Sequence, residues 1–176
     1  TDPTTGKVVT APEYGGTLTQ AGATFAAHAD PFYGTGVHFF LAGVNETLAI
    51  SDWGLDREEF GFRTWYRPLF AMGGLLAESW ETPDPLTYIF HIRKGVHWHN
   101  KPPVNGREMT AKDVEFSLLR ITGLSEEGPP VTTYEISLMP IASIEATDQW
   151  TVVIKLERAR PDALRAILIS ANAYIL

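Results

Sequence analysis

Residues 75–120 read LLAESWETPDPLTYIFHIRKGVHWHNKPPVNGREMTAKDVEFSLLR, and this stretch decides the fold. The pattern predicts two strands joined by a tight turn, a third short strand, a loop and a capped helix. Leu86, Tyr88, Phe90 and Ile92 alternate with more polar residues, as in a strand with one buried face. Pro83 and Pro85 lack a backbone N–H, so we expect the chain to reverse between residues 81 and 86.

The end of the same stretch predicts an amphipathic helix. Thr110 followed three residues later by Asp113 has the spacing of a capping box. One face of the helix is apolar and consists of Ala111, Val114, Leu118 and Ile121. Phe116 points to the opposite side, so we expect this helix to be covered on both sides.

The chain outside this stretch predicts further strands and helices. A polar tail at 1–14 precedes a strand at 17–21, a loop at 22–36 and a helix at 37–48. The short piece 48–50 is expected to be extended, and an irregular aromatic-rich stretch at 51–74 contains one strand near 62–66. A hairpin at 141–157 turns at Asp148-Gln149, and a further helix begins near Pro161. The predicted class is α/β with α+β character, in which hairpins of sheet carry packed helices.

Composition excludes several kinds of partner and chemistry. The net charge of −7 argues against nucleic acid and anionic membranes as direct partners. The chain contains no cysteine, which excludes disulfides, thiol catalysis and cysteine-ligated metal sites. The chain contains no run of 18 apolar residues, so the sequence predicts no transmembrane helix.

Both ends of the sequence suggest a longer protein. The first residue is Thr1 and not Met, which indicates processing or cutting. Residues 166–176 form the apolar run AILISANAYIL, whereas natural termini are usually polar. We therefore expect an N-terminal fragment; the alternative is a C-terminal helix packed into the core.

Two groups of residues could indicate catalysis or metal binding. His91, His97 and His99 lie close in sequence, and imidazoles at i and i+2 of a strand share one face, where they could bind Zn²⁺, Cu²⁺ or Ni²⁺. The spacing is weak evidence, and half-buried histidines satisfied by hydrogen bonds explain it better. Glu78 and Glu81 are three apart, so in a strand they face opposite sides and make a poor acid–base pair. We predict no catalysis, no resident metal and no cofactor.

The aromatic residues divide into two groups. Strand positions predict that one group belongs to the core, namely Trp80, Tyr88, Phe90, Trp98 and Trp150. The other group lies in loops, where binding surfaces usually lie, and consists of Trp53, Trp65, Tyr66, Phe32 and Tyr33.

The ordered motifs resemble the family 5 extracellular solute-binding proteins. AESWE, LTYIFHIRKGVHWH and TAKDVEFSLLR keep the order and nearly every spacing of the family pattern. The resemblance extends to the first strand at Gly15-Gly16-Thr17-Leu18, the Ala29-Asp30-Pro31 turn, the 44–48 segment and the hairpin at 144–156. Departures are the longer loops at 100–109 and 51–74.

The resemblance implies a fold, a function and a location. The chain would be part of lobe I of a two-lobed periplasmic-binding-protein-like fold. It would have a tail at 1–14, the first strand, cleft loop and helix at 15–50, and an incomplete small subdomain at 51–176. The function would be to capture a peptide-like solute for an ABC importer and deliver it to the permease. The protein would act outside the cytoplasmic membrane, either free in a periplasm or lipid-anchored at the membrane's outer face.

The resemblance also implies where the ligand binds. The loop at 23–33 would look toward the cleft, so Thr24, Phe25 and Asp30 are the expected ligand contacts, and most others would lie beyond Leu176. Two alternatives remain open from the residues alone. One is a metal-binding module or metal-dependent enzyme built on the three histidines, and the other is a stand-alone carbohydrate or peptide interaction module.

Overall fold

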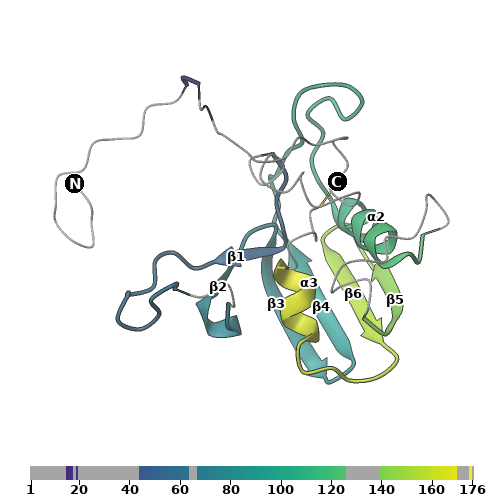
Figure 1. Ribbon diagram of the computed structural model, residues 1–176. Helices are drawn as coiled ribbons and strands as arrows, with labels where there is room; N and C mark the ends of the chain where they lie inside the picture. Colours follow the sequence, from purple (N-terminus) through teal and green to yellow (C-terminus); the bar gives the residue numbers. More distant parts are fainter. Residues whose placement is uncertain are drawn as a thin grey trace.

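A computed structural model describes residues 15–17, 19, 44–63, 67–125, 139–169 and 175 (Figure 1). A four-stranded antiparallel sheet has the order β3-β4-β6-β5, and a separate two-stranded ribbon pairs β1 with β2. Helices α2 and α3 lie on the same side of the larger sheet, α3 in front of β3 and β4, and α2 near β6 and β5. This arrangement of antiparallel hairpins with packed helices is the predicted α+β character.

Strands β3 (Ala77–Asp84) and β4 (Thr87–Ile92) form the hairpin predicted around the proline-rich turn. The predicted limit of β3 is wrong, because the strand runs past Pro83 and Asp84 still pairs with Thr87. The proline is tolerated because β3 is an edge strand and its register shifts between Glu81 and Asp84. The reversal itself is tight, and the Asp84 carboxylate accepts a hydrogen bond of 2.7 Å from the Leu86 N–H.

Alternation along β4 predicts its buried face well. Tyr88, Phe90 and Ile92 are buried, while Leu86 precedes the strand and is 38% exposed, contrary to expectation. Strands β5 (Ile141–Ala146) and β6 (Thr151–Leu156) form the second predicted hairpin. In β6, Val152, Ile154 and Leu156 are buried and Lys155 is exposed, as predicted.

Helix α2 (Ala111–Thr122) begins and ends where the sequence indicates. The Thr110 and Asp113 side chains form the reciprocal capping box, and Gly123 ends the helix in the left-handed conformation with φ 73°. The four predicted apolar positions of the helix are all buried. Phe116 is 42% exposed, so the described part of the chain covers only one side of α2.

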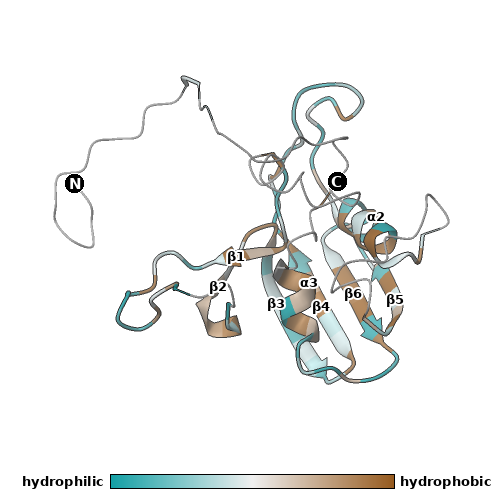
Figure 2. Cartoon of the chain, viewed as in Figure 1, coloured by the Kyte–Doolittle hydropathy of each residue, from teal (hydrophilic) through white to brown (hydrophobic). Residues whose placement is uncertain are grey.

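Helix α3 (Ala163–Ile169) follows Pro161 closely and adds Ala163, Ala166, Ile167 and Leu168 to the core. One apolar core joins the inner face of the larger sheet to both helices and to residues 48–49 and 72. Apolar residues, brown in Figure 2, colour much of α3 and alternate with polar ones along the strands. Neither described helix has both the length and the apolar character needed to cross a bilayer.

The core prediction for the aromatic residues is partly right. Tyr88 and Phe90 are buried, and Trp80 and Trp98 are partly buried against the core. Trp150 is half-buried outside the core cluster, with the Lys94 ammonium 5.9 Å from its ring centroid. Its ring therefore lies within cation–π range of the Lys94 ammonium.

The ribbon β1 (Ala49–Ser51) and β2 (Met72–Gly74) corrects the expectation for residues 51–74. Residues 62 and 63, the described part of the predicted strand at 62–66, are not in a strand; the strand lies at 72–74, after the short 3-10 helix η1 (Leu69–Ala71). Gly74 pairs with Ala49, and a Cβ at Gly74 would lie 2.3 Å from the Ala77 carbonyl oxygen. Only glycine fits this close approach.

Other expectations fall largely outside the described residues. Of the predicted helix at 37–48, residues 44–48 are described and are not helical. The predicted piece at 48–50 is confirmed by β1. Of the predicted first strand, residues 17 and 19 are described and carry no strand assignment.

Candidate functional site

The ligand contacts expected from the sequence are not in the described part of the chain. Thr24, Phe25 and Asp30, together with the rest of the loop at 23–33, lie outside it. They stay a prediction. Of the loop aromatics, Phe32, Tyr33, Trp65 and Tyr66 also lie outside it.

The three histidines do not converge on a metal site. His91 Nε2 lies 2.9 Å from Glu81 Oε1, which joins β4 to β3. His97 Nδ1 lies 2.9 Å from the Gly106 carbonyl oxygen, and His99 has no comparable contact with the other two. Among the described residues, no group of three or more His, Asp or Glu side chains could hold a metal ion.

The candidate carboxylates serve local structure. Glu78 and Glu81 are both exposed, and Glu81 contacts His91. The hydrogen bond from the Leu86 N–H is the main reason why the pKa of Asp84 lies below its ordinary value. Asp84 therefore acts as an acceptor in a turn, and Glu81 takes part in a cross-strand pair.

A cavity of about 320 Å³ lies between segments that are far apart in sequence. Its lining comes from the segment before β1, from Leu76, from the loop at 95–109 and from residue 175. The described residues of the lining are Val44, Asn45, Glu46, Leu76, Val96, His97, Trp98, His99, Met109 and Ile175. The Ile175 N–H donates a hydrogen bond of 3.0 Å to the Glu46 carbonyl oxygen and joins two of these segments.

The chemistry of the cavity suits reversible binding. Its walls are about equally polar and apolar, and its volume lies at the lower end of the range of small-molecule pockets, which begins at about 300 Å³. The only sequence signal for this cavity was the His97-Trp98-His99 motif, since its other walls come from distant parts of the chain.

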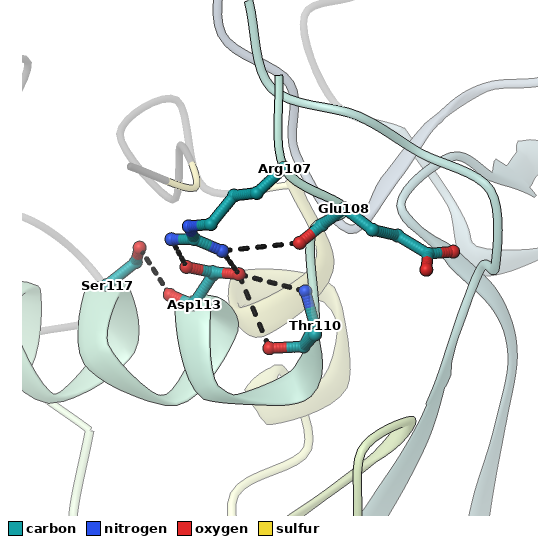
Figure 3. A network of polar contacts seen from close by, with 5 residues as sticks. All are labelled: Arg107, Glu108, Thr110, Asp113 and Ser117. Atoms are coloured by element: carbon teal, nitrogen blue, oxygen red, sulfur yellow. Dashed lines mark hydrogen bonds and ion pairs between the residues drawn. The ribbon is translucent and has the colours of Figure 1, made fainter. Parts of the chain in front are cut away.

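A polar network stands beside the cavity and connects the loop to helix α2 (Figure 3). The Arg107 guanidinium donates two hydrogen bonds to the Asp113 carboxylate, one of 2.8 Å to Oδ2 and a shorter one to Oδ1. The Thr110 N–H donates to Asp113 Oδ2 at 2.8 Å, and the Ser117 hydroxyl donates to the Asp113 carbonyl oxygen at 2.8 Å. Burial alone would raise the pKa of Asp113, but these bonds from Arg107 and Thr110 hold the pKa below its ordinary value.

Trp98 packs against this network. The Arg107 guanidinium carbon lies 5.9 Å from the centroid of its ring. The Trp98 indole N–H is buried and has no hydrogen bond of regular geometry within the described residues, but it acts on the Asp113 carboxylate and helps to lower its pKa. Trp98 thus contributes at once to the cavity wall and to the surroundings of the ion pair.

A second candidate site, apart from the cavity, is the aromatic segment, which we define as the described residues between 52 and 70. Trp53 and Phe62 stack with centroids 4.8 Å apart, and Phe60 meets Phe62 and Phe70 edge to face. The Arg57 guanidinium lies 4.4 Å from the centroid of Phe62. Trp53 and Phe70 are 55% and 61% exposed, so this cluster lies on the surface.

The fold is shared with periplasmic binding proteins, of which this chain matches a part. The ABC transporter-associated periplasmic binding protein DppA of Helicobacter pylori, solved with the peptide STSA, matches with a TM-score of 0.63 and 28% identity, covering 84% of this chain and 28% of that one. A nickel ABC transporter protein from Bacillus halodurans matches with a TM-score of 0.58 and 25% identity, covering 84% of this chain and 25% of that one.

The family follows from the sequence match. Residues 71–175 match the family described as bacterial extracellular solute-binding proteins, family 5 Middle. The match covers more than half of the chain, which therefore belongs to this family. The predicted resemblance is thereby confirmed.

Curated relatives agree over shorter spans. A putative ABC transporter peptide-binding protein of Brucella ovis is 37% identical over 92 residues, which are 52% of this chain and 16% of the relative. The dipeptide-binding protein of Escherichia coli is 55% identical over 47 residues, which are 26% of this chain and 9% of the relative. The chain thus spans a small part of the length of the proteins it resembles.

Proposed function

We propose that this chain is part of the substrate-binding protein of an ABC importer. Such a protein captures a peptide-like solute outside the cytoplasmic membrane and delivers it to the permease. The observation that carries the proposal is the family match over residues 71–175. The peptide-bound Helicobacter relative supports a peptide as the solute class.

The protein would bind the solute without chemical change. Asp84 accepts a hydrogen bond in a turn, Glu81 pairs with His91 across two strands, and Asp113 caps a helix. The cavity combines apolar walls with an about equal share of polar groups, which can recognise a solute by apolar contact and by hydrogen bonds.

Location, partners and organisation belong to the same proposal. The protein would act in a periplasm or at the outer face of the membrane, with the permease subunits as its protein partners. Residues 15–50 would carry the first strand and the cleft loop of lobe I, and residues 51–176 its small subdomain, after a tail at 1–14. Thr24, Phe25 and Asp30 would contact the solute.

Calorimetric titration tests the proposal. Protein containing this chain is titrated with di-, tri- and tetrapeptides, and saturable binding of at least one peptide is expected. Saturable binding of an opine or a nickel chelate, without binding of any peptide, would overturn the solute class. No saturable binding of any of these pools would overturn the receptor function itself.

Alanine substitutions test the predicted contacts. Thr24→Ala, Phe25→Ala or Asp30→Ala should each weaken peptide affinity by about tenfold, which corresponds to about 1.4 kcal/mol. Thr5→Ala, in the predicted tail, is the matched control and should leave affinity unchanged. An unchanged affinity in all three variants would remove this loop from the site.

A further inference from the structure

The loop at 95–109 holds its own shape. The Trp98 backbone N–H donates to the Arg107 carbonyl oxygen at 3.0 Å, and the Met109 backbone N–H donates to the Val96 carbonyl oxygen at 2.8 Å. The only strand-like pairing is one antiparallel bridge between His97 and Glu108, so the predicted third strand is reduced to this bridge. At the base, the Gly95 N–H donates to Glu108 Oε1 at 2.7 Å. A loop whose polar groups close on one another can move without losing those bonds.

The loop's polar connections to the rest of the described chain meet at one carboxylate, that of Asp113. The hydrogen bonds of residues 95–109 to described residues close inside the loop, except those that Arg107 donates to Asp113, and the buried Trp98 indole N–H also acts on this carboxylate. The other attachment is apolar: Met109 is buried, and Val96 and Trp98 pack partly against the core. Apolar contacts are non-directional, so they attach the loop without fixing its orientation.

The Arg107–Asp113 pair fixes the orientation of the loop. Its two parallel hydrogen bonds fix the guanidinium plane relative to the carboxylate. Asp113 is itself held at the first turn of α2 by the Thr110 N–H. The Asp113 side chain is 10% exposed and the Arg107 side chain 50%, so the pair joins a fixed acceptor to a donor carried by the loop.

The position of the loop determines the shape of the cavity. Five of the ten described lining residues belong to the loop, namely Val96, His97, Trp98, His99 and Met109. At its base, Gly95 has φ +76°, a conformation that other residues rarely adopt. Glycine at the base and an open space around it are compatible with a hinge.

We infer that the 95–109 loop is a flap that moves as a unit, and that Arg107 is the positioning residue that seats it on Asp113. The position in which the Arg107–Asp113 pair holds the loop sets the size of the cavity. Its consequence for solute selection rests on the proposed function, since it requires that the cavity receives part of the solute.

Spin labelling tests the flap directly. The chain has no cysteine, so Lys101→Cys in the loop and Glu145→Cys in β5 can be labelled selectively. Both positions are exposed. Double electron–electron resonance should give a narrow distance distribution in the parent protein and a broadened or shifted one after Arg107→Ala. Amide hydrogen exchange at Trp98 and Met109 should stay slow in the same variant.

Three further variants control the experiment. Lys112→Ala removes a neighbouring exposed ion pair with Glu115 on the same helix and should leave the distribution unchanged. Arg107→Lys should restore it only in part, because an ammonium cannot make the two parallel bonds. If Arg107→Ala does not fold, Asp113→Asn, which keeps an oxygen for the Thr110 N–H, replaces it.

The outcomes separate the possibilities. An unchanged distribution in Arg107→Ala would show that the pair does not seat the loop. A broadened distribution with fast exchange at Trp98 and Met109 would show that the loop unravels, which would also overturn the inference. These measurements need no solute, so a failure of the proposed function leaves them valid.

Solute selection is measured separately, with the dipeptide Ala-Ala and the tetrapeptide Ser-Thr-Ser-Ala. We expect Arg107→Ala to change the ratio of their dissociation constants by about tenfold, or about 1.4 kcal/mol. An unchanged ratio in a variant whose loop has moved would overturn the role in selection. Absence of binding to the parent protein would overturn the proposed function instead.

Discussion

Two loops of the molecule are stabilised by different forces: the 95–109 loop, which follows β4, and the aromatic segment, which lies between β1 and β2. The 95–109 loop is closed by backbone hydrogen bonds and seated by one bidentate ion pair. The aromatic segment is held by ring stacking and by guanidinium groups over aromatic faces, with Asp52 and Asp56 capping its turns. Directional bonds give the first loop a defined orientation, whereas the second depends on contact area and on the ribbon at its base.

This difference predicts which substitution affects which loop. A change in the ribbon should disturb the aromatic segment and leave the 95–109 loop in place. A change in the ion pair should do the reverse. Effects that spread from one loop to the other would break the comparison.

The largest effect is expected at the base of the aromatic segment. Gly74→Ala places a Cβ against the Ala77 carbonyl oxygen and should lower the free energy of unfolding by about 2 to 3 kcal/mol, the usual cost of overpacking. Urea denaturation measures it. Gly73→Ala is the matched control, since its Cβ would meet Asp52 at an ordinary 3.9 Å. Equal costs at the two glycines would contradict the close approach.

The next effect is expected at the helix cap. Asp113→Ala removes the capping carboxylate and the partner of Arg107, and should cost about 2 kcal/mol of unfolding free energy. Lys112→Ala, which breaks an exposed pair one residue away, should cost under about 0.5 kcal/mol. Thermal or urea unfolding compares the two. Similar losses would show that the Asp113 network adds nothing beyond surface charge.

A smaller effect is expected within the aromatic segment. Phe62→Leu removes the stack with Trp53 and the face under Arg57, and should cost about 1 kcal/mol. Phe116→Leu replaces another aromatic side chain that is exposed and should cost less. Hydrogen exchange after Phe62→Leu should quicken in the aromatic segment and stay unchanged at Trp98.

The smallest effect is the dependence on pH. Because the fold lowers the pKa of Asp113 from its ordinary value of 3.8, the pair adds stability above that value. That contribution is lost as the pH falls through the folded-state pKa. Unfolding free energies measured between neutral and acid pH should therefore fall less steeply in Asp113→Asn than in the parent protein. Identical slopes would contradict the coupling.

Local patterns predicted the elements whose stability is local. The α2 cap, its apolar face and the alternation in β4 and β6 depend on residues a few positions apart, and the structure confirms them. The β2 strand was misplaced because its partner β1 lies some twenty residues earlier and the intervening aromatics hide any periodicity. The predicted end of β3 before Pro83 was wrong because a single sequence does not show that β3 is an edge strand, where proline is tolerated.

The cavity was beyond sequence reasoning for the same physical reason. Its walls come from residues near 45, 76, 96–109 and 175, which only the tertiary fold brings together. Arg107 and Asp113 were visible as a loop arginine and a helix cap, but their pairing depends on how the loop folds back onto α2. The predicted contacts at Thr24, Phe25 and Asp30 came from family resemblance and remain to be tested by the titrations above.

The edge strand β3 has one further consequence. A free row of N–H and C=O groups at a sheet edge invites a strand from another copy to add to it, which leads to aggregation. Here Pro83 withholds one donor, and the register shifts on both sides of Ser79–Glu81 break the regular spacing of the others. Exposed glutamates at 78 and 81 add repulsion between copies. The departures from ideal pairing in this strand thus make the edge a poor template for a strand from another copy.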